Sequence, residues 1–214
     1  MSLAIFAVVG YLAGSMPFGY WLVRLTKGVD IRTVGSGNIG ATNVWRTYGR
    51  SYGIPVMALD ISKAFVPALV ATQVDGHTAG VVAGAAAMLG HWRPLFLGFA
   101  KGGKMVAPAA GAFFGVAPAL GGAGAALWIL VFLATRYVSV ASMVSASSLP
   151  LLAYLLGYPW SVIAFGAAAG VGIVALHRAN IRRLLAGTES RATLRLRRGG
   201  GPTAPAAPSS ARTP

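Results

Sequence analysis

The stretch of the chain best suited to chemistry is glycine-rich and polar, and it lies at residues 35–46, GSGNIGATNVWR. Its glycines permit positive φ angles and close backbone approach, while its Ser, Thr and Asn side chains are short hydrogen-bonding groups. Arg46 adds a fork-shaped cation that suits phosphate. A loop of this kind at the start of a helix binds an anion through its backbone N–H groups. The alternative interpretation is a polar turn between two helices.

This stretch also contains the spacing GxGxxG, which occurs in dinucleotide-binding folds. That spacing indicates a nucleotide site only between a strand and a helix of a βαβ unit. Here an apolar run precedes it, and the sequence shows no alternation of strands and helices. A dinucleotide-binding fold is therefore excluded.

A second polar cluster, Lys-Gly-Gly-Lys at residues 101–104, comes directly before an apolar run. Two glycines flanked by lysines at the start of a helix are similar to a nest of N–H groups that cradles phosphate. The spacing and the missing terminal Ser or Thr exclude a Walker motif. The alternative is that the lysines anchor the chain by facing lipid headgroups.

Two further clusters lie at residues 136–142, RYVSVAS, and 177–189, HRANIRRLLAGTE. In the first, two serines share a helix face, although small hydroxyls in helices commonly bond back to their own backbone. In the second, His177 and Asn180 become neighbours if the last helix continues through them. A structural role is the alternative for His177, and pairing with a nearby arginine is the alternative for Glu189.

The four clusters share one chemical character. They are cationic and rich in neutral donors, with almost no carboxylate, no metal-ligand set and no Ser–His–Asp order. Such a site suits phosphate-bearing substrates, because fixed donors stabilise the charge that develops in the transition state. The chain has no cysteine, so disulfides and thiolate chemistry are excluded.

The composition predicts a membrane protein. The chain has 214 residues, of which 56% are hydrophobic and only 10% are charged, whereas soluble domains carry about 25% charged residues. The net charge is +14, but a nucleic-acid-binding protein would need a more solvated surface. We therefore predict an all-α, polytopic integral membrane bundle of about seven helical segments, of which five to seven are true spans. The predicted segments are 3–23, 54–73, 78–92, 105–116, 119–134, 138–156 and 160–176.

Charge placement predicts which side each loop faces. All basic loops fall on one side of the membrane only if residues 105–134 form a hairpin of two short helices, broken near Gly115 and Pro118. The rival threading makes 105–134 one long span and places Arg136 on the opposite side. The positive-inside rule favours the hairpin. It predicts an outer N-terminus, with the C-terminus and the active-site loops in the cytoplasm.

One basic residue falls inside a predicted span. Lys63 comes three residues after Asp60, so the two side chains share a helix face and can neutralise each other in an apolar surrounding. The favoured interpretation is an internal pair that anchors packing. The alternative is that the pair borders a polar cavity.

Taken together, the four clusters resemble the bacterial membrane glycerol-3-phosphate acyltransferases of the PlsY type, which use acyl-phosphate. The resemblance runs in order from about residue 8 to residue 189. Residues 35–46 are similar to the family's first signature, and the Lys-Gly-Gly-Lys region after His91 and Pro94 is similar to the second. The later signatures are similar to the remaining two clusters. The HxxxxD motif of other glycerolipid acyltransferases is absent from this sequence.

The resemblance implies acyl transfer from a fatty acyl-phosphate to the 1-hydroxyl of sn-glycerol 3-phosphate. The products would be lysophosphatidate and phosphate, in the first step of phospholipid synthesis. Because an acyl-phosphate already has a good leaving group, we expect direct attack by the glycerol hydroxyl, with a substrate phosphate as base and without an acyl-enzyme. The resemblance implies no metal and no organic cofactor. The enzyme that makes acyl-phosphate is the expected functional partner, and membrane lipids surround the chain.

The resemblance also implies the roles of particular residues. Ser36, Asn38, Thr42 and Arg46 would form the phosphate and glycerol site, Gly102, Gly103 and Lys104 would cradle the acyl-phosphate, and Ser142, His177 and Asn180 would complete the polar pocket. The expected catalytic residues are Ser36, Arg46, Lys104, His177 and Asn180. The expected substrate-binding residues are Gly35, Gly37, Asn38, Thr42, Asn43, Gly102, Gly103 and Ser142.

By this resemblance, residues 1–189 are a membrane acyltransferase domain of the bacterial cytoplasmic membrane, and residues 190–214 are a disordered basic tail. The chain departs from the family's pattern at three positions. Met105 replaces a usual glycine, Pro108 replaces a usual threonine, and Ala64 replaces a usual glycine. The alternative function is a catalytically impaired or transport-type membrane protein that binds phosphorylated lipids or metabolites on the same scaffold.

Overall fold

The computed structural model describes residues 2–192, and this part of the chain contains helices and turns but no strand. The predicted all-α fold is confirmed. The elements are α1 (Leu3–Gly14), α2 (Phe18–Lys27), a 3-10 turn at Ile31–Thr33, α3 (Ala41–Tyr48), α4 (Arg50–Trp92), a 3-10 turn at Leu95–Leu97, α5 (Val106–Val116), α6 (Pro118–Thr135), α7 (Val138–Leu155), α8 (Trp160–Leu176) and α9 (Arg178–Leu185).

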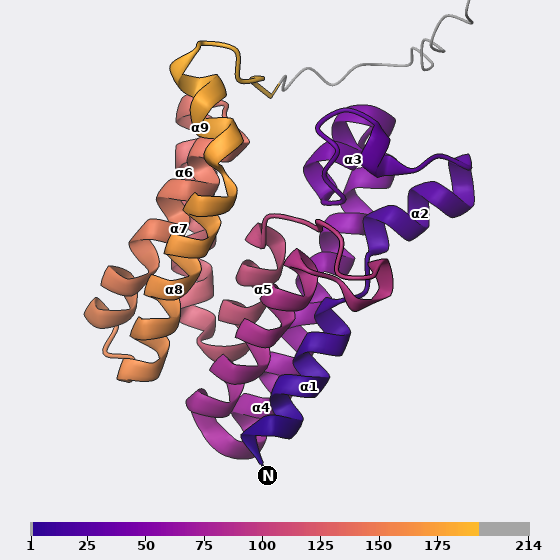
Figure 1. Cartoon of the computed structure of the whole chain (residues 1–214). Helices are drawn as coiled ribbons and strands as arrows, with labels where there is room; N and C mark the ends of the chain where they lie inside the picture. Colours follow the sequence, from indigo (N-terminus) through magenta and orange to yellow (C-terminus); the bar gives the residue numbers. More distant parts are fainter. Residues whose placement is uncertain (1, 193–214) are drawn as a thin grey trace, which may run out of the picture.

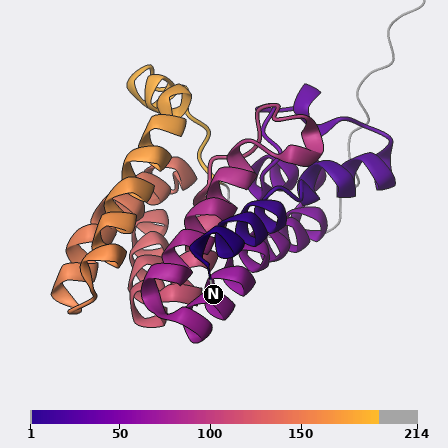
Figure 2. The same ribbon diagram turned by 60° about the horizontal axis from the view of Figure 1, so that its bottom comes forward.

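The helices form two groups that lie side by side (Figures 1 and 2). One group contains α1, α4 and α5, and the other contains α6, α7 and α8. Helix α4 reverses direction where Asp75 and Gly76 leave the helical conformation, so it supplies two antiparallel arms, residues 50–74 and 77–92. The stacked rings of Phe113 on α5 and Phe165 on α8, with centroids 4.6 Å apart, join the two groups.

The predicted hairpin at residues 105–134 is confirmed. Helix α5 ends at Val116 and α6 begins at Pro118. Proline suits the first position of a helix because the N–H it lacks would have no partner there. The rival interpretation, one long span through this region, is wrong.

The structure differs from the predicted segments at three places. The run 3–23 is not one helix, because α1 ends at Gly14 and α2 begins at Phe18 after Pro17, which cannot donate a helical hydrogen bond. Between the predicted segments 3–23 and 54–73, the chain forms α3 and the first turn of α4. Residues 178–185 form α9, beyond the last predicted segment. The predicted disordered tail lies outside the described residues from residue 193 onwards.

Four stretches of the described residues are long and apolar enough to cross a membrane. The bent pair of α8 and α9, whose axes differ by 58°, makes a fifth. One of the four stretches, residues 50–97, contains both arms of α4 and therefore doubles back on itself. With 11 residues, α5 is the short apolar helix of the bundle.

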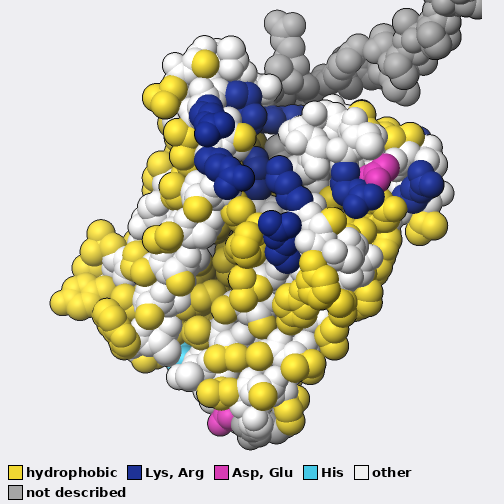
Figure 3. Space-filling view, in the orientation of Figure 1, with side chains coloured by type: hydrophobic (Ala, Val, Ile, Leu, Met, Phe, Trp, Pro, Cys, Tyr) yellow, Lys and Arg dark blue, Asp and Glu magenta, His cyan; other side chains and the backbone are white. Residues whose placement is uncertain are grey.

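Basic side chains gather at one end of the bundle (Figure 3). This is the end that carries α2, α3 and α9, whereas the chain starts at the opposite end (Figure 1). The one-sided distribution of charge agrees with the threading that the positive-inside rule predicts.

Close packing around α4 depends on small residues. A Cβ atom built on Gly10 of α1 would lie 2.9 Å from the carbonyl carbon of Ala83. A Cβ on Gly111 of α5 would lie 2.9 Å from the carbonyl carbon of Ile61 and 3.0 Å from the backbone nitrogen of Phe65. Both distances are shorter than van der Waals contact, so these helices approach α4 only because glycine lacks a side chain.

This packing predicts opposite effects for two glycine substitutions. Gly111→Ala would force α5 away from α4 and lower the free energy of unfolding by about 1–3 kcal/mol. Gly122→Ala is the control, because a Cβ at Gly122 of α6 meets nothing within 4 Å, and alanine favours a helix over glycine by up to about 1 kcal/mol. Thermal unfolding in detergent measures both, and equal losses of stability would contradict the packing argument.

Candidate active site

A cavity of about 490 Å³ lies between the two helix groups. Its polar lining comes from α3, α9 and the loop before α5, and its apolar lining comes mainly from α5, α6 and α7. Along each of these three helices the lining runs away from the polar end: from Val106 to Phe114 on α5, from Ile129 to Gly121 on α6 and from Val138 to Leu149 on α7. The cavity is therefore polar at its basic end and mainly apolar in the rest of its length.

Asn43 organises the loop at residues 34–40 from the first turn of α3. Its Nδ2 donates to the carbonyl oxygens of Ile31, Val34 and Asn38, and its Oδ1 accepts from the backbone N–H of Ser36 at 2.9 Å. Gly35 and Gly37 both have positive φ, at 58° and 67°, which a side chain would disfavour. These hydrogen bonds hold the loop in shape; Asn43 also lines the cavity, and its role in substrate binding stays a prediction.

Three polar side chains of this region line the cavity and are exposed. Ser36, Thr42 and Arg46 all face it. Arg46 also reaches across to the other helix group, where its guanidinium donates to the carbonyl oxygen of Ser190 at 3.3 Å. The first polar cluster is therefore joined to the segment that follows α9.

The loop at residues 101–104 does not form the predicted nest of free N–H groups. The N–H groups of Gly102 and Gly103 donate to the carbonyl oxygens of Trp92 and His91, at 2.9 Å and 3.0 Å. A Cβ on Gly103 would lie 2.6 Å from two ring carbons of His91. These glycines let the loop pack directly onto the end of α4, and neither of them lines the cavity.

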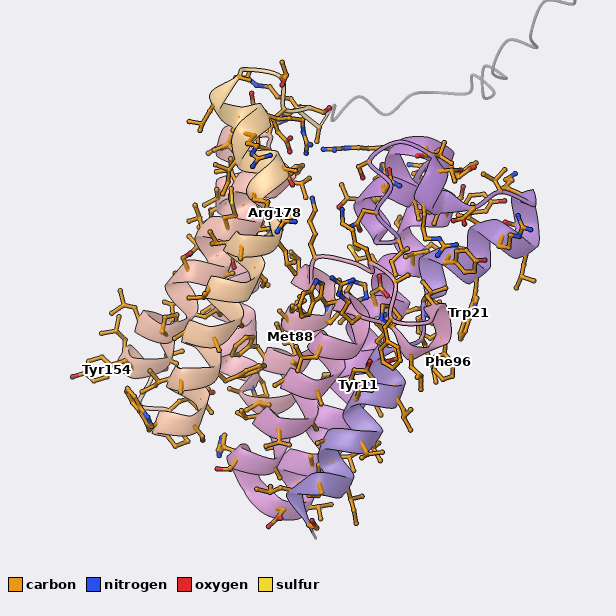
Figure 4. The ribbon with its side chains drawn as sticks, in the orientation of Figure 1. Tyr11, Trp21, Met88, Phe96, Tyr154 and Arg178 are labelled. Carbon is orange, nitrogen blue, oxygen red and sulfur yellow. The ribbon has the colours of Figure 1, made fainter. Side chains whose placement is uncertain are left out.

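The base of this loop is fastened to the N-terminal helices. The Tyr11 hydroxyl of α1 donates to the carbonyl oxygen of Arg93 at 2.7 Å. Trp21 of α2 lies beside Phe96, with ring centroids 6.0 Å apart, at the edge of the bundle (Figure 4). Asn38 Nδ2 approaches the carbonyl oxygen of Gly102 at 3.5 Å, which joins the two polar loops.

Lys104 extends from this loop to the opposite helix group. Its Nζ donates to Oδ1 of Asn180 at 2.5 Å, and Nδ2 of Asn180 donates to Oε1 of Glu189 at 2.6 Å. Because Glu189 accepts from Nδ2, the amide oxygen of Asn180 is turned toward Lys104. Glu189 also accepts from Ser139 Oγ at 2.8 Å and from Arg183 Nε at 2.7 Å.

The surroundings shift the pKa values of both charged groups in this chain of hydrogen bonds. Burial, with Arg183 nearby, lowers the pKa of Lys104 to about 8. Burial alone would raise the pKa of Glu189, but hydrogen bonds from Asn180, Ser139 and Arg183 outweigh it and hold that pKa below its ordinary value. Glu189 is therefore a charged, fully bonded support for Asn180.

Two more predicted residues line the cavity near the junction of α8 and α9, which Arg178 marks in Figure 4. His177 Nδ1 lies 2.8 Å from the carbonyl oxygen of Ile173. A carbonyl only accepts, so Nδ1 carries the proton and Nε2 is left as an acceptor. Ser142 Oγ donates to the carbonyl oxygen of Val138 at 2.8 Å and accepts from Trp128 Nε1 at 3.1 Å, so it bonds back to its own helix.

A buried ion pair lies beneath the 101–104 loop. Lys63 Nζ is 2.8 Å from Asp60 Oδ1, 2.8 Å from His91 Nδ1 and 2.8 Å from the carbonyl oxygen of Met16. The predicted pairing of Asp60 with Lys63 is confirmed. The alternative, that the pair borders the cavity, holds for Asp60, which lines it together with His91, but not for Lys63.

Comparison with known proteins identifies the chain's relatives. The sequence profile described as glycerol-3-phosphate acyltransferase matches residues 4–187. The chain is 45% identical to the glycerol-3-phosphate acyltransferase of Desulforudis audaxviator over 91% of its own length and 98% of that protein. It is 46% identical to the Aquifex aeolicus enzyme of the same description, over 88% and 98%. The chain belongs to the glycerol-3-phosphate acyltransferase family.

Two crystal structures of PlsY (YgiH), described as an integral membrane glycerol 3-phosphate acyltransferase, have the same fold. The glycerol 3-phosphate form gives a TM-score of 0.86 at 43% identity, covering 90% of this chain and 96% of that one. The lysophosphatidic acid form gives 0.82 at 42% identity, covering 89% and 95%. The resemblance on which the family was predicted is confirmed, and so is the integral membrane fold.

The cavity of this family member brings together most of the predicted site residues. Four glycines predicted to bind substrate do not line it, and each has a structural position in a loop instead. The predicted site residues that line the cavity are Ser36, Asn38, Thr42, Asn43, Arg46, Lys104, Ser142, His177 and Asn180. The four glycines that do not are Gly35, Gly37, Gly102 and Gly103.

Several lining residues were not predicted as site residues. Asp60 and His91 belong to the buried ion pair, and Ser139 and Glu189 support Asn180. The signal in the sequence that could have indicated Asp60 and Glu189 was the rarity of acids, since only four are present in the chain. Within residues 2–192, no group of three or more His, Asp or Glu side chains could hold a metal ion.

The two unusual residues after Lys104 lie outside the cavity lining. Met105 has a φ of 66°, the left-handed conformation that glycine adopts most easily, and its side chain is buried in the main hydrophobic cluster. Pro108 lies in the first turn of α5, where its missing N–H is tolerated. Neither substitution narrows the cavity.

The bonding of Glu189 predicts different effects for two serines of α7. Ser139→Ala would remove a donor from a buried carboxylate and lower the free energy of unfolding by about 1–3 kcal/mol. Ser148→Ala is the matched control, because Ser148 Oγ donates to Ser145 in its own helix, and we expect a change within about 0.5 kcal/mol. Unfolding in detergent compares the two, and equal losses would contradict a supporting role for Ser139.

Proposed function

We propose that the protein transfers a fatty acyl group from an acyl-phosphate to the 1-hydroxyl of sn-glycerol 3-phosphate. The observation that carries this proposal is the meeting of Arg46, Lys104 and Asn180, from three separate segments, at the polar end of a mainly apolar cavity. The relatives support the choice of acceptor and product, because the PlsY structures are described as glycerol 3-phosphate and lysophosphatidic acid forms.

The polar end offers what two phosphate-bearing substrates need. Arg46 can bind two phosphate oxygens at once, and Lys104 supplies an ammonium that Asn180 holds in place. Ser36 and Thr42 add hydroxyl donors on the exposed side. His177 and Asn180 face them from the junction of α8 and α9. Fixed cations placed in this way bring two dianions together and position them for reaction.

The reaction proceeds by direct attack. The O1 oxygen of glycerol 3-phosphate forms a bond to the acyl carbonyl carbon, and the bond from that carbon to the phosphate oxygen breaks. The proton of O1 passes to the leaving phosphate, so atoms and charge balance. Lys104 and Arg46 stabilise the negative charge that develops on the departing phosphate. Lysophosphatidate and inorganic phosphate are the products.

An acyl-enzyme is disfavoured by the bonding of the cavity serines. Ser142 and Ser145 donate to backbone carbonyl oxygens of Val138 and Gly124, and Ser139 donates to Glu189. Among the described residues, no serine of the cavity is hydrogen-bonded to a histidine that could activate it. An acyl-phosphate needs no such activation, because phosphate is already a good leaving group.

The apolar part of the cavity suits the acyl chain of the donor. Gly121 and Gly124 of α6 let that helix pack closely against Phe114 and Leu149, and Phe113 and Leu149 supply apolar surface to the cavity. Met105 and Pro108 lie outside this lining, which supports a working donor site over the impaired alternative.

The charge distribution supports the orientation in the membrane. The basic end carries the polar part of the cavity (Figure 3), so the positive-inside rule supports a site at the cytoplasmic face of the bacterial inner membrane. The N-terminus then lies outside. Acyl-phosphate reaches the site from the enzyme that makes it.

The direct test is phosphate release from palmitoyl-phosphate by the purified protein in lipid, with and without glycerol 3-phosphate. Release that depends on the acceptor is expected. Lys104→Ala and Arg46→Ala should each lower kcat/KM by about 100-fold or more, since each removes a charged donor from a preorganised site. Lys101→Ala is the matched control, because Lys101 is exposed on the same loop and does not line the cavity. No acceptor-dependent release by the folded protein would contradict the proposed function.

The lowered pKa of Lys104 predicts how activity depends on pH. The ammonium form binds phosphate, and it predominates below the pKa of about 8. The value of kcat/KM reports the free enzyme, so it should fall as the pH rises through this value. In Lys104→Arg the cation stays charged throughout, and the alkaline fall should disappear from whatever activity remains. A fall at the same pH in Lys104→Arg would contradict the assignment to Lys104.

A further inference from the structure

One carboxylate of the cavity has no function in the mechanism above. The chain has four acids. Asp30 pairs with Arg32 in the loop after α2, Asp75 lies at the reversal of α4, and the oxygens of Glu189 accept three hydrogen bonds. The fourth acid, Asp60, lines the cavity from the first arm of α4.

Asp60 is buried and paired with Lys63, but one of its carboxylate oxygens has no hydrogen-bond donor. Its side chain is 2% exposed. The ammonium of Lys63 lies 2.8 Å from each of Asp60 Oδ1, His91 Nδ1 and the carbonyl oxygen of Met16. Within residues 2–192, Asp60 Oδ1 is nonetheless a buried atom without a hydrogen-bond partner. A buried polar atom of this kind ordinarily has a donor.

Asp60 lies close to the loop that carries Lys104. His91 Nδ1 is 3.7 Å from Asp60 Oδ1, and the His91 ring lies directly beneath Gly103, whose next residue is Lys104. A single imidazole therefore separates the carboxylate from the loop that carries Lys104. Asp60 lines the cavity from one helix group, and α7 lines it from the other.

The other side chains at the polar end present hydrogen-bond donors, and phosphate oxygens accept hydrogen bonds from them. A polyol phosphate also carries hydroxyl groups, and each of these needs an acceptor when it is buried. The 1-hydroxyl gives up its proton during the transfer, whereas the 2-hydroxyl keeps its proton throughout. A lasting acceptor is therefore needed for the 2-hydroxyl.

We propose that the Asp60 carboxylate accepts a hydrogen bond from the 2-hydroxyl of glycerol 3-phosphate and so selects an acceptor with a hydroxyl at carbon 2. This inference rests on the proposed function. Lys63 and His91 are positioning residues for the carboxylate. The hydrogen bond orients the glycerol backbone, with its 1-hydroxyl toward the acyl carbonyl carbon and its phosphate toward the cations.

The test combines a variant with an altered substrate. The value of kcat/KM is measured for glycerol 3-phosphate and for 3-hydroxypropyl phosphate, which lacks only the 2-hydroxyl. The wild-type protein should prefer glycerol 3-phosphate by at least about tenfold, because a site built to bind a hydroxyl rejects the analogue that lacks it. In Asp60→Asn the preference should fall to about threefold or less. A purely structural role would lower both values equally and leave their ratio unchanged.

A second variant keeps the test decisive if Asp60→Asn does not fold. Asp60→Leu combined with Lys63→Met replaces the ion pair by apolar side chains of similar size, a change that buried pairs commonly tolerate. This double variant should also lose the preference. Ser145→Ala, on the opposite wall of the cavity, is the matched control, and its ratio should equal that of the wild type. An active wild type with no preference, or an unchanged ratio in folded Asp60 variants, would overturn the inference alone. An inactive wild type would overturn the proposed function and this inference with it.

Discussion

The ammonium group of Lys63 joins three segments on which the polar end of the cavity rests. It contacts Asp60 in the first arm of α4, His91 in the second arm and the carbonyl oxygen of Met16 between α1 and α2. A charge inside an apolar bundle is costly unless it is paired and hydrogen-bonded. The cation therefore requires the arms of α4 and the end of α1 to stay together. The loop that packs on His91 receives its position from this arrangement.

Both helix groups contribute side chains to the site. The N-terminal group supplies Arg46 and Lys104, and the C-terminal group supplies Asn180 and Glu189, so the hydrogen bond from Lys104 to Asn180 crosses the cavity. Glu189 is fully bonded within its own group and holds the amide in one orientation. A cavity wall assembled in this way keeps its donors aimed at a ligand without rearrangement, which is the condition for electrostatic catalysis.

Much of the fold could be predicted because single residues have strong local effects. Pro118 and the one-sided charge predicted the hairpin of α5 and α6. Pro17 carried a similar signal, but the unbroken apolar run from residue 3 to residue 23 masked the break between α1 and α2. The motif segments predicted most of the polar lining of the cavity, because residues that bind one substrate must converge whatever their separation in the chain.

The errors in the site have a different physical origin. A sequence shows that Gly102 and Gly103 can approach another group closely, but not whether that group is a ligand or the backbone of Trp92 and His91. In the same way, it shows that Glu189 has arginines nearby, but not that it accepts from an amide and a serine on another helix. Such pairings depend on how the two helix groups meet, which no local pattern records.

The cavity has one polar end and a mainly apolar remainder, and this has a consequence for how the two proposed substrates arrive. The acceptor comes from the aqueous phase, so its availability follows its concentration in water. The donor arrives within the hydrocarbon layer, so its availability follows its mole fraction among the lipids. Diluting the membrane with inert phospholipid should therefore slow the protein even when the total amount of each reactant is unchanged.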